Sequence, residues 1–231
     1  MLQHILNGGY PVKAKQFAVI GIGRFGESLI YELCKMNHHV LAIDTSEDRI
    51  EDISRIATYA VQADATEEKT LKALDIKSFD AVIVAIGGDL QASILTVLTL
   101  QELGVQTIYA KAQNSMHGKV LEKMGTSSVI YPERDMATRL ARSLVSTNII
   151  EQIEISSEYG ITEFHAPQYF SGRSLAQLRL PNKYNVTILA VKSGENIKIT
   201  PPADYVIYEG DILVGFGSND FIEKLGDIHN G

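Results

Sequence analysis

Cysteine is nearly absent from this sequence, which has one such residue, Cys34, among 231. A single cysteine excludes an intramolecular disulfide framework and fits a chain that folds in a reducing compartment. Cys34 falls among Ile30, Leu33 and Met36, in a segment with helical spacing. We therefore interpret it as a small residue of the core and not as a nucleophile.

Positive charge is also scarce. The chain has 21 Lys and Arg residues against 28 Asp and Glu, which gives a formal net charge of −7 at pH 7. A protein that neutralises nucleic-acid phosphates needs clustered Lys and Arg, and no basic stripe is present. The charge balance therefore excludes a general nucleic-acid-binding protein. The apolar share of 45% is ordinary for a globular protein.

No apolar run is long enough to span a bilayer. The most apolar stretch, residues 92–105, is interrupted by Gln101 and Glu102 and is shorter than the roughly 20 residues that a spanning helix needs. We interpret it as a buried helix. Residues 1–14 mix polar and apolar types without periodicity and do not have the composition of a secretory leader. We expect them to form a flexible arm.

Sequence motifs of common enzymes and metal sites are missing as well. The six histidines show no spacing that resembles a zinc site. There is no GxSxG nucleophile, no GxxxxGK[ST] phosphate loop and no catalytic Cys/His set. We therefore predict no catalytic residues.

A nucleotide-binding pattern is present near the start of the chain. The apolar run at residues 17–20 leads directly into Gly21-Ile22-Gly23-Arg24-Phe25-Gly26. Gly21 permits a tight turn, Gly23 leaves room for a pyrophosphate, and Gly26 lets the following helix pack closely on the strand. The free N–H groups and positive dipole at the start of that helix favour an anion.

An acidic residue follows at the distance that this pattern requires. Asp44 stands 18 residues after Gly26, at the end of a second apolar run at residues 40–43. A carboxylate in this position can accept hydrogen bonds from ribose hydroxyls. ATP and NAD both carry an unmodified ribose, so Asp44 suits either ligand.

The segments that follow predict an α/β fold. Strand-like and helix-like segments alternate from Gln16 to about Leu144, as in a parallel sheet covered by helices on both faces. Ser46 is the expected N-cap of a helix that runs to residue 56, Thr66 is the expected cap of another, and a further helix begins at Pro132. The predicted strands are residues 17–20, 40–43, 59–62, 81–85, 107–110 and 128–131.

After Asn148 the pattern changes to short alternating strands, expected at residues 150–155, 187–191 and 212–216. We predict a Rossmann-like, doubly wound parallel sheet in residues 15–146, followed by a smaller α+β domain in residues 147–231. The helix from Pro132 connects the two domains. Its apolar stripe of Met136, Leu140 and Leu144 is a candidate contact with another subunit.

Several longer strings resemble one known family, the KtrA/KtrC-type regulators of potassium transport, which are built from an RCK (regulator of conductance of potassium) domain. The resemblance covers nearly everything from Lys15 to Leu225. Besides the glycine motif, these strings are Asp64-Ala65-Thr66, Val82-Ile83-Val84-Ala85-Ile86-Gly87, Gln91-Ala92-Ser93, Lys111-Ala112-Gln113-Asn114, Pro132-Glu133-Arg134-Asp135-Met136, Leu178-Arg179-Leu180-Pro181-Asn182-Lys183-Tyr184 and Thr187-Ile188-Leu189-Ala190-Val191-Lys192.

The resemblance implies a ring of eight subunits, assembled from dimers, that docks beneath a KtrB/KtrD-type potassium channel dimer. The chain would then be cytoplasmic, at the inner face of the cell membrane. ATP and ADP would compete for a site in the N-terminal domain, and their exchange would change the shape of the ring and the activity of the channel. The regulator itself would catalyse no reaction, so the chain would not be an enzyme.

The family also implies roles for three charged residues. Arg24 would reach the γ-phosphate of ATP, in its own or a neighbouring subunit, because a planar cation suits that oxygen cluster. Lys111 would contact phosphate, and Glu133 would help to hold a divalent cation such as Mg²⁺, which prefers oxygen ligands. A solvated side chain is the alternative for Arg24, and a favourable position in the helix dipole is the alternative for Glu133.

Five further residues would lie at the same edge of the sheet. Asp64, Ala65 and Thr66 follow the strand at residues 59–62, where the base would lie if the phosphates sit at the glycine motif. Capping by Thr66 is the alternative explanation. Ile86 and Gly87 end the strand at residues 81–85, where a small residue leaves room for a ligand, although a plain strand-to-helix turn would also favour glycine.

The resemblance implies a second ligand, cyclic di-AMP, at a dimer interface of the C-terminal domain. Leu175, Leu180 and Pro201 fall on the apolar positions of that site. However, Pro181 stands where the family usually carries Arg, and Thr187 stands where it usually carries Asn. Because Pro181 has neither a side-chain donor nor a backbone N–H, we expect weak binding of cyclic di-AMP or none.

Two other functions are compatible with the glycine motif and Asp44. A small NAD-dependent oxidoreductase would need a proton donor, and the C-terminal domain offers no obvious one. An NAD(H)-binding redox sensor is the other alternative, since related RCK proteins bind NAD. The position of Arg24 favours ATP and ADP over NAD(H).

Overall fold

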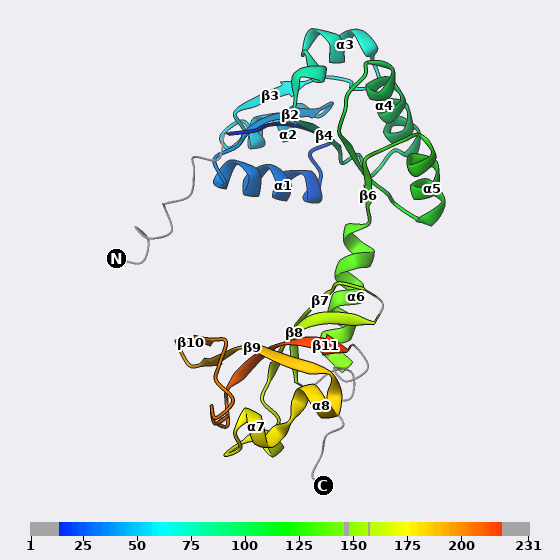
Figure 1. The fold of residues 1–231 in the computed structure, drawn as a ribbon. Helices are drawn as coiled ribbons and strands as arrows, with labels where there is room; N and C mark the ends of the chain where they lie inside the picture. The colour runs from blue at the N-terminus through cyan, green and yellow to red at the C-terminus, as the bar shows by residue number, and fades with distance from the viewer. Residues whose placement is uncertain (1–13, 146–147, 157, 219–231) are drawn as a thin grey trace. The chain divides into compact units, whose positions relative to one another are not determined.

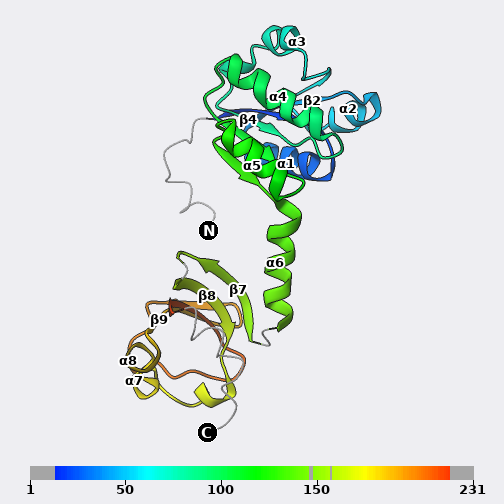
Figure 2. The ribbon, with the colours of Figure 1, turned by 90° about the vertical axis from the view of Figure 1, so that its right-hand side faces the viewer.

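A computed structural model describes residues 14–145, 148–156 and 158–218 of the chain. Two compact units divide between Arg134 and Asp135, and we call them the N-terminal unit and the C-terminal unit. Figures 1 and 2 show their elements from two sides. The predicted arm at residues 1–14 lies almost wholly outside the described residues. The predicted domain boundary at residues 146 and 147 also lies outside them, so both stay predictions.

The N-terminal unit contains the predicted parallel sheet. All neighbouring strands pair in parallel, in the order β3-β2-β1-β4-β5-β6, so the order reverses between β1 and β4. Each predicted strand is confirmed to within one residue at either end. The bounds are β1 Gln16–Ile20, β2 His39–Asp44, β3 Tyr59–Gln62, β4 Ala81–Val84, β5 Ile108–Lys111 and β6 Ser128–Ile130.

Helices cover both faces of this sheet. In β1 to β4, alternate residues enter two separate clusters, so that Val19 of β1 packs with Ile30 of α1, whereas Ile20 packs with Leu71 of α3. Figure 1 shows α1 and α3 on opposite sides of the strands. Burial on both faces explains why the strands are nearly continuous apolar runs in the sequence. The helices are α1 Arg24–Lys35, α2 Glu47–Ile53, α3 Glu68–Ala73, α4 Leu90–Glu102 and α5 Ser115–Lys123, with a 3₁₀ turn, η3, at Ile76–Ser78.

Two expectations about helix starts have different outcomes. Ser46 caps α2 as predicted, because its Oγ accepts a hydrogen bond from the N–H of Arg49, although α2 ends at Ile53 and not at residue 56. Thr66 does not cap α3, whose N-cap is Glu67. The hydroxyl of Thr66 instead donates to Asp64 Oδ1 at 2.7 Å. The Thr66 hydroxyl is therefore bonded to the carboxylate of Asp64, two residues earlier, and is not available to cap the helix.

Two core assignments also have different outcomes. The apolar stretch at residues 92–105 forms most of α4, but only one face of that helix is buried, and Leu95 and Leu98 are exposed. Cys34 packs against the cluster beneath α1, as expected, and burial raises the pKa of its thiol. A protonated thiol is a poor nucleophile, which agrees with a core role.

The helix α6, Pro132–Val145, begins in the N-terminal unit and continues into the C-terminal unit. Met136, Leu140 and Leu144 of α6 are exposed in the single chain. Their contact with another subunit stays a prediction. Among residues 14–145, 148–156 and 158–218, no helix combines the length and apolarity that crossing a membrane takes.

The C-terminal unit is a five-stranded antiparallel sheet with short helices, in the strand order β10-β9-β11-β8-β7. Its core includes Phe164, Phe170, Leu180 and Leu213. The three predicted strands are confirmed as β7, β9 and β11, whereas β8 and β10 were not predicted. The bounds are β7 Ile149–Glu154, β8 Tyr159–His165, β9 Val186–Ser193, β10 Asn196–Ile199, β11 Ile212–Ser218, α7 Leu175–Leu178 and α8 Leu180–Tyr184, with a 3₁₀ turn, η4, at Gln168–Phe170.

Candidate functional site

A cavity of about 910 Å³ opens at the carboxyl edge of the parallel sheet in the N-terminal unit. This volume lies within the range of about 300–1,000 Å³ that is usual for small-molecule sites. Ligands of doubly wound sheets bind at this edge, where the strand order reverses. Of the predicted site residues, Gly21, Gly23, Arg24, Phe25, Asp44, Asp64, Ala65, Thr66, Ile86, Gly87, Lys111 and Glu133 line the cavity, and Gly26 does not.

The three glycines of the motif differ in what a Cβ atom at each position would contact. Gly21 has a φ of +95°, and a Cβ there would lie 2.9 Å from the backbone of Ala85. A Cβ on Gly26 would overlap the carbonyl oxygen of Gly21. A Cβ on Gly23 would meet nothing within 4 Å and would project into open space at the start of α1. Gly21 and Gly26 therefore let the backbone pack closely, whereas Gly23 keeps the helix start accessible.

Asp44 is held by the backbone at the end of β2. Its Oδ2 accepts a hydrogen bond from the N–H of Ile22 at 2.6 Å, and its Oδ1 accepts one from the N–H of Ser46 at 2.9 Å. The guanidinium of Arg49 lies 3.3 Å from Oδ2. The side chain of Asp44 is only 6% exposed, yet it borders the cavity, so its carboxylate faces the ligand space in one fixed orientation.

A cluster of opposite charges lies at another part of the cavity. Lys111 Nζ, at the end of β5, is 2.6 Å from Glu133 Oε1, at the start of α6. The hydrogen bond from Lys111 lowers the pKa of Glu133 below its ordinary value, and the backbone N–H of Glu133 and the charges of Lys111 and Arg24 act in the same direction. Lys111 Nζ also lies 6.0 Å from the centre of the Phe25 ring. The first turns of α1 and α6 and the end of β5 thus meet at one place.

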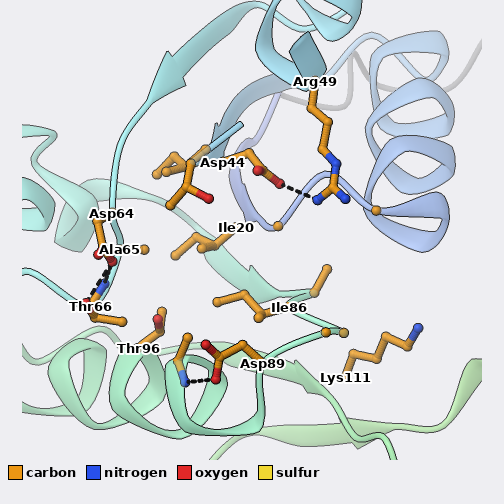
Figure 3. Close-up of a pocket in the computed structure, with 18 of the residues that line it drawn as sticks. Ile20, Asp44, Arg49, Asp64, Ala65, Thr66, Ile86, Asp89, Thr96 and Lys111 are labelled. Atoms are coloured by element: carbon orange, nitrogen blue, oxygen red, sulfur yellow. Dashed lines mark hydrogen bonds and ion pairs between the residues drawn. The ribbon is translucent and has the colours of Figure 1, made fainter. Parts of the chain in front are cut away.

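Asp64 and Thr66 form a closed turn after β3. The hydroxyl and the N–H of Thr66 both donate to Asp64 Oδ1, and these bonds lower the pKa of Asp64. Ala65 between them is buried. In Figure 3, Asp64 and Thr66 lie at one end of the cavity, Lys111 lies at the other, and Asp44 lies between these ends along one wall.

The TrkA-N domain family matches residues 17–132, and the TrkA-C domain family matches residues 163–229. The chain is 46% identical over 211 residues to Ktr system potassium uptake protein C of Bacillus subtilis. This match covers 91% of this chain and 96% of that protein. The chain belongs to the Ktr potassium uptake protein family. The resemblance found in the sequence is thereby confirmed.

Other similar proteins agree with the Ktr assignment. Ktr system potassium uptake protein A of Bacillus subtilis is 45% identical over 93% of this chain and 96% of its own length. The protein of that name from Vibrio alginolyticus is 36% identical over 89% of this chain and 94% of its own length. The RCK domain of GsuK matches with a TM-score of 0.65 at 19% identity, over 96% of this chain and 49% of that chain. At that identity the likeness shows the RCK fold, and this Ktr family member spans about half of the GsuK chain.

Two parts of the cavity wall in this Ktr family member were not predicted from the sequence. Arg49 was missed, and the available signal was a basic residue five positions after the predicted ribose-binding acid. The start of α4 was also missed, although Asp89 before an apolar run is an N-cap signal, and its Oδ1 accepts the N–H of Ala92 at 2.9 Å. The additional lining residues are Ile20, Ile43, Thr45, Arg49, Ala63, Ala85, Gly88, Asp89, Gln91, Ala92, Leu95 and Thr96.

The described part of the chain contains no group of three or more His, Cys, Asp or Glu residues that could hold a metal ion. Glu133 borders the cavity, but it is paired with Lys111. A divalent cation at Glu133 would therefore need further oxygen ligands, such as those of a bound phosphate. The metal role of Glu133 stays a prediction.

The residues predicted to meet cyclic di-AMP differ in burial in the C-terminal unit of this Ktr family member. Leu180 is 1% exposed and Leu175 packs against the same core, whereas Pro181 and Thr187 are exposed. A shallow depression of about 490 Å³ is lined instead by Ala176, Gln177, Arg179 and Lys183. Our expectation of weak cyclic di-AMP binding stays a prediction.

The pairing of Lys111 with Glu133 makes a prediction about pH. Lys111→Met removes the main cause of the lowered pKa, so we expect the pKa of Glu133 to rise toward its ordinary value of 4.5. In the wild type this pair stabilises the fold above pH 4.5 and loses its effect as the pH falls through the lower, folded-state pKa. Glu133 is 69% exposed, so we expect a clear change in titration and little change in stability.

Carbon-13 NMR of the side-chain carboxyl groups measures this pKa directly. Lys119→Met serves as the control, because it removes a charge from an exposed position of α5. An unchanged pKa of Glu133 in Lys111→Met would contradict the role assigned to Lys111.

Proposed function

We propose that this chain is the regulatory subunit of a potassium uptake system and binds ATP and ADP in the cavity of its N-terminal unit. It is not an enzyme. It assembles from dimers into a ring of eight subunits and acts at the inner face of the cell membrane, on a KtrB/KtrD-type potassium channel dimer. Its relatives named as Ktr system potassium uptake proteins support the transport role.

The arrangement of groups along the cavity carries the nucleotide proposal. Asp44 lies between the closed turn at Asp64 and Thr66 and the charged cluster at Lys111. This order matches base, ribose and phosphates in a nucleotide. The fixed carboxylate of Asp44 accepts the ribose hydroxyls, and the N-terminus of α1 at Gly23 takes the phosphates, because its N–H groups favour an anion.

The terminal phosphate is the chemical difference between ATP and ADP. Lys111 and Arg24 supply positive charge on the phosphate side, since both lower the pKa of Glu133 by their charge. Glu133 shares a divalent cation with the phosphate oxygens when one is bound. For ATP to act as a switch, it must bind one shape of the ring better than ADP does, because equal affinities would shift nothing.

Isothermal titration calorimetry of the nucleotide-free protein tests this function. We expect ATP and ADP to bind, NADH to give no heat of binding, and cyclic di-AMP to bind weakly or not at all. Magnesium should strengthen the binding of ATP more than that of ADP. GsuK, whose fold is similar, is a channel that has been determined bound to NAD, so NADH is the necessary competing ligand. Selective binding of NADH would overturn the proposal and favour a redox sensor.

Arg24→Ala should weaken ATP more than ADP. A hydrogen bond to a charged group contributes about 1.5–3 kcal/mol, so we expect ATP affinity to fall by about tenfold or more while ADP affinity changes little. Calorimetry with both nucleotides measures the difference. Glu27→Ala is the control, because Glu27 lies in the same first turn of α1 and does not line the cavity. Equal losses for ATP and ADP would refute the assignment of Arg24 to the γ-phosphate.

A further inference from the structure

The inner face of α4 has a buried hydroxyl group that makes no hydrogen bond. Thr96 is 0% exposed, and its Oγ1 has no hydrogen-bond partner within the described residues. Thr96 also lines the cavity. Burying a hydroxyl without a partner is unfavourable, because the group loses its hydrogen bonds to water and gains none in return.

Another threonine of the same helix shows the usual solution. Thr99 Oγ1 donates to the carbonyl oxygen of Leu95 at 2.9 Å, one turn earlier in α4. Threonines in helices commonly bond in this way. Thr96 makes no such bond to the carbonyl of Ala92, although that carbonyl stands in the equivalent position. A helical position alone therefore does not explain why the Thr96 hydroxyl is unpaired.

Thr96 lies at the end of the cavity that the base would occupy. Figure 3 shows it on the same side as Asp64, Ala65 and Thr66, with Lys111 on the opposite side. Asp64 Oδ1 already accepts two hydrogen bonds from Thr66, so Oδ2 is the oxygen of this carboxylate that is left for a ligand. Half-buried Ile86 and buried Ala65 supply apolar contact for a flat ring.

We propose that the Thr96 hydroxyl is the hydrogen-bond partner of the nucleotide base and fixes how deeply the base enters the cavity. The inference rests on the proposed nucleotide function and deepens it. A hydroxyl donates one hydrogen bond and accepts others, so it suits the adenine edge, where a ring nitrogen accepts and the amino group donates. Because the Thr96 hydroxyl is buried in the free chain, the base must enter against the wall of α4 to make this bond.

Three variants test the proposal. Thr96→Val keeps the shape of the side chain and removes the hydroxyl, and Thr96→Ser keeps the hydroxyl. Ser93→Ala is the matched control, because Ser93 lies on the same helix, is 0% exposed and has an equally unpaired hydroxyl, but does not line the cavity. Each variant is titrated with ADP and with tripolyphosphate, which carries phosphates without a base, and each is melted without ligand.

We expect Thr96→Val to lose about tenfold in ADP affinity, which is the effect of one hydrogen bond, and to keep its affinity for tripolyphosphate. Its melting temperature without ligand should rise by about 2–4 °C, since an unpaired buried hydroxyl has been removed. Thr96→Ser should bind ADP as the wild type does. Ser93→Ala should also melt higher, with unchanged ADP affinity.

The outcomes separate this inference from the function on which it rests. If the wild type binds ADP and Thr96→Val binds it equally well, the base contact is wrong and the nucleotide site stands. If Thr96→Val loses ADP and tripolyphosphate alike, the substitution has disturbed the cavity as a whole, and the base contact is refuted. If the wild type binds no adenine nucleotide, the proposed function itself fails.

Discussion

Gly26→Ala is expected to unfold the N-terminal unit under conditions in which the wild type is stable. The added Cβ would overlap the carbonyl oxygen of Gly21, which is backbone and cannot rotate away. Gly21 in turn has the backbone of Ala85 directly behind it, so the turn has no room to retreat. Overpacking costs about 1–3 kcal/mol in tolerant cores, and we expect about 3 kcal/mol or more here because the backbone must move. Thermal unfolding followed by circular dichroism measures the loss.

Two other glycines supply the controls for this prediction. Gly118→Ala also creates an overlap, but with the hydroxyl end of Tyr131, a side chain that can turn aside, so the loss of stability should be smaller. Gly23→Ala should leave the melting temperature unchanged, because nothing lies within 4 Å of the new Cβ. Its methyl group would project where the phosphates approach, so ADP affinity should fall. A Gly26→Ala protein that melts like the wild type would refute the close-packing role.

Asp44→Asn should lose both stability and nucleotide binding. The two carboxylate oxygens of Asp44 each accept a backbone N–H, from Ile22 and from Ser46. An asparagine has one carbonyl oxygen, so its amide group would face one of these N–H donors and leave it unpaired. The attraction to Arg49 is lost as well. We expect a destabilisation of about 2 kcal/mol, in the range of hydrogen bonds to charged groups.

The effect of Asp44→Asn on ligands separates the ribose contact from the fold. We expect ADP affinity to fall by about tenfold or more, because a charged acceptor for the ribose hydroxyls is lost. Asp48→Asn is the control, since Asp48 lies four residues later in the first turn of α2, is exposed and does not line the cavity. Calorimetry and thermal unfolding on both variants give the comparison. A folded Asp44→Asn protein that binds ADP as tightly as the wild type would exclude Asp44 from the ribose site.

The N-terminal sheet could be predicted from the sequence because its signals are local. Strands buried on both faces must be apolar throughout, and Gly21, Gly23 and Gly26 mark the first turn without reference to the rest of the chain. The strand β8 was missed because two of its buried positions are Gly160 and Thr162, which do not give an apolar alternation. The strand β10 was missed because every one of its residues is exposed.

The cavity residues that come from α2 and α4 were harder to predict than those that directly follow the strands. Asp44 and the glycines follow a fixed spacing, whereas the position of Arg49 depends on how α2 packs beside β2. Thr96 borders the cavity because α4 packs on one face of the sheet with its first turns beside the cavity, which no spacing in the sequence encodes. Thr66 was assigned to a cap because the competing carboxylate of Asp64 was not considered. Each of these misses comes from a contact that forms after the local elements are in place.

The cavity is lined by residues that extend along the chain from Ile20 to Glu133. Its walls therefore come together only when every parallel strand pair of the sheet has formed, and such pairings are slow because their partners are far apart in sequence. A folding transition state that lacks part of the sheet also lacks the site. It follows that a bound nucleotide prolongs the lifetime of the folded unit by slowing its unfolding and does nothing to speed its folding.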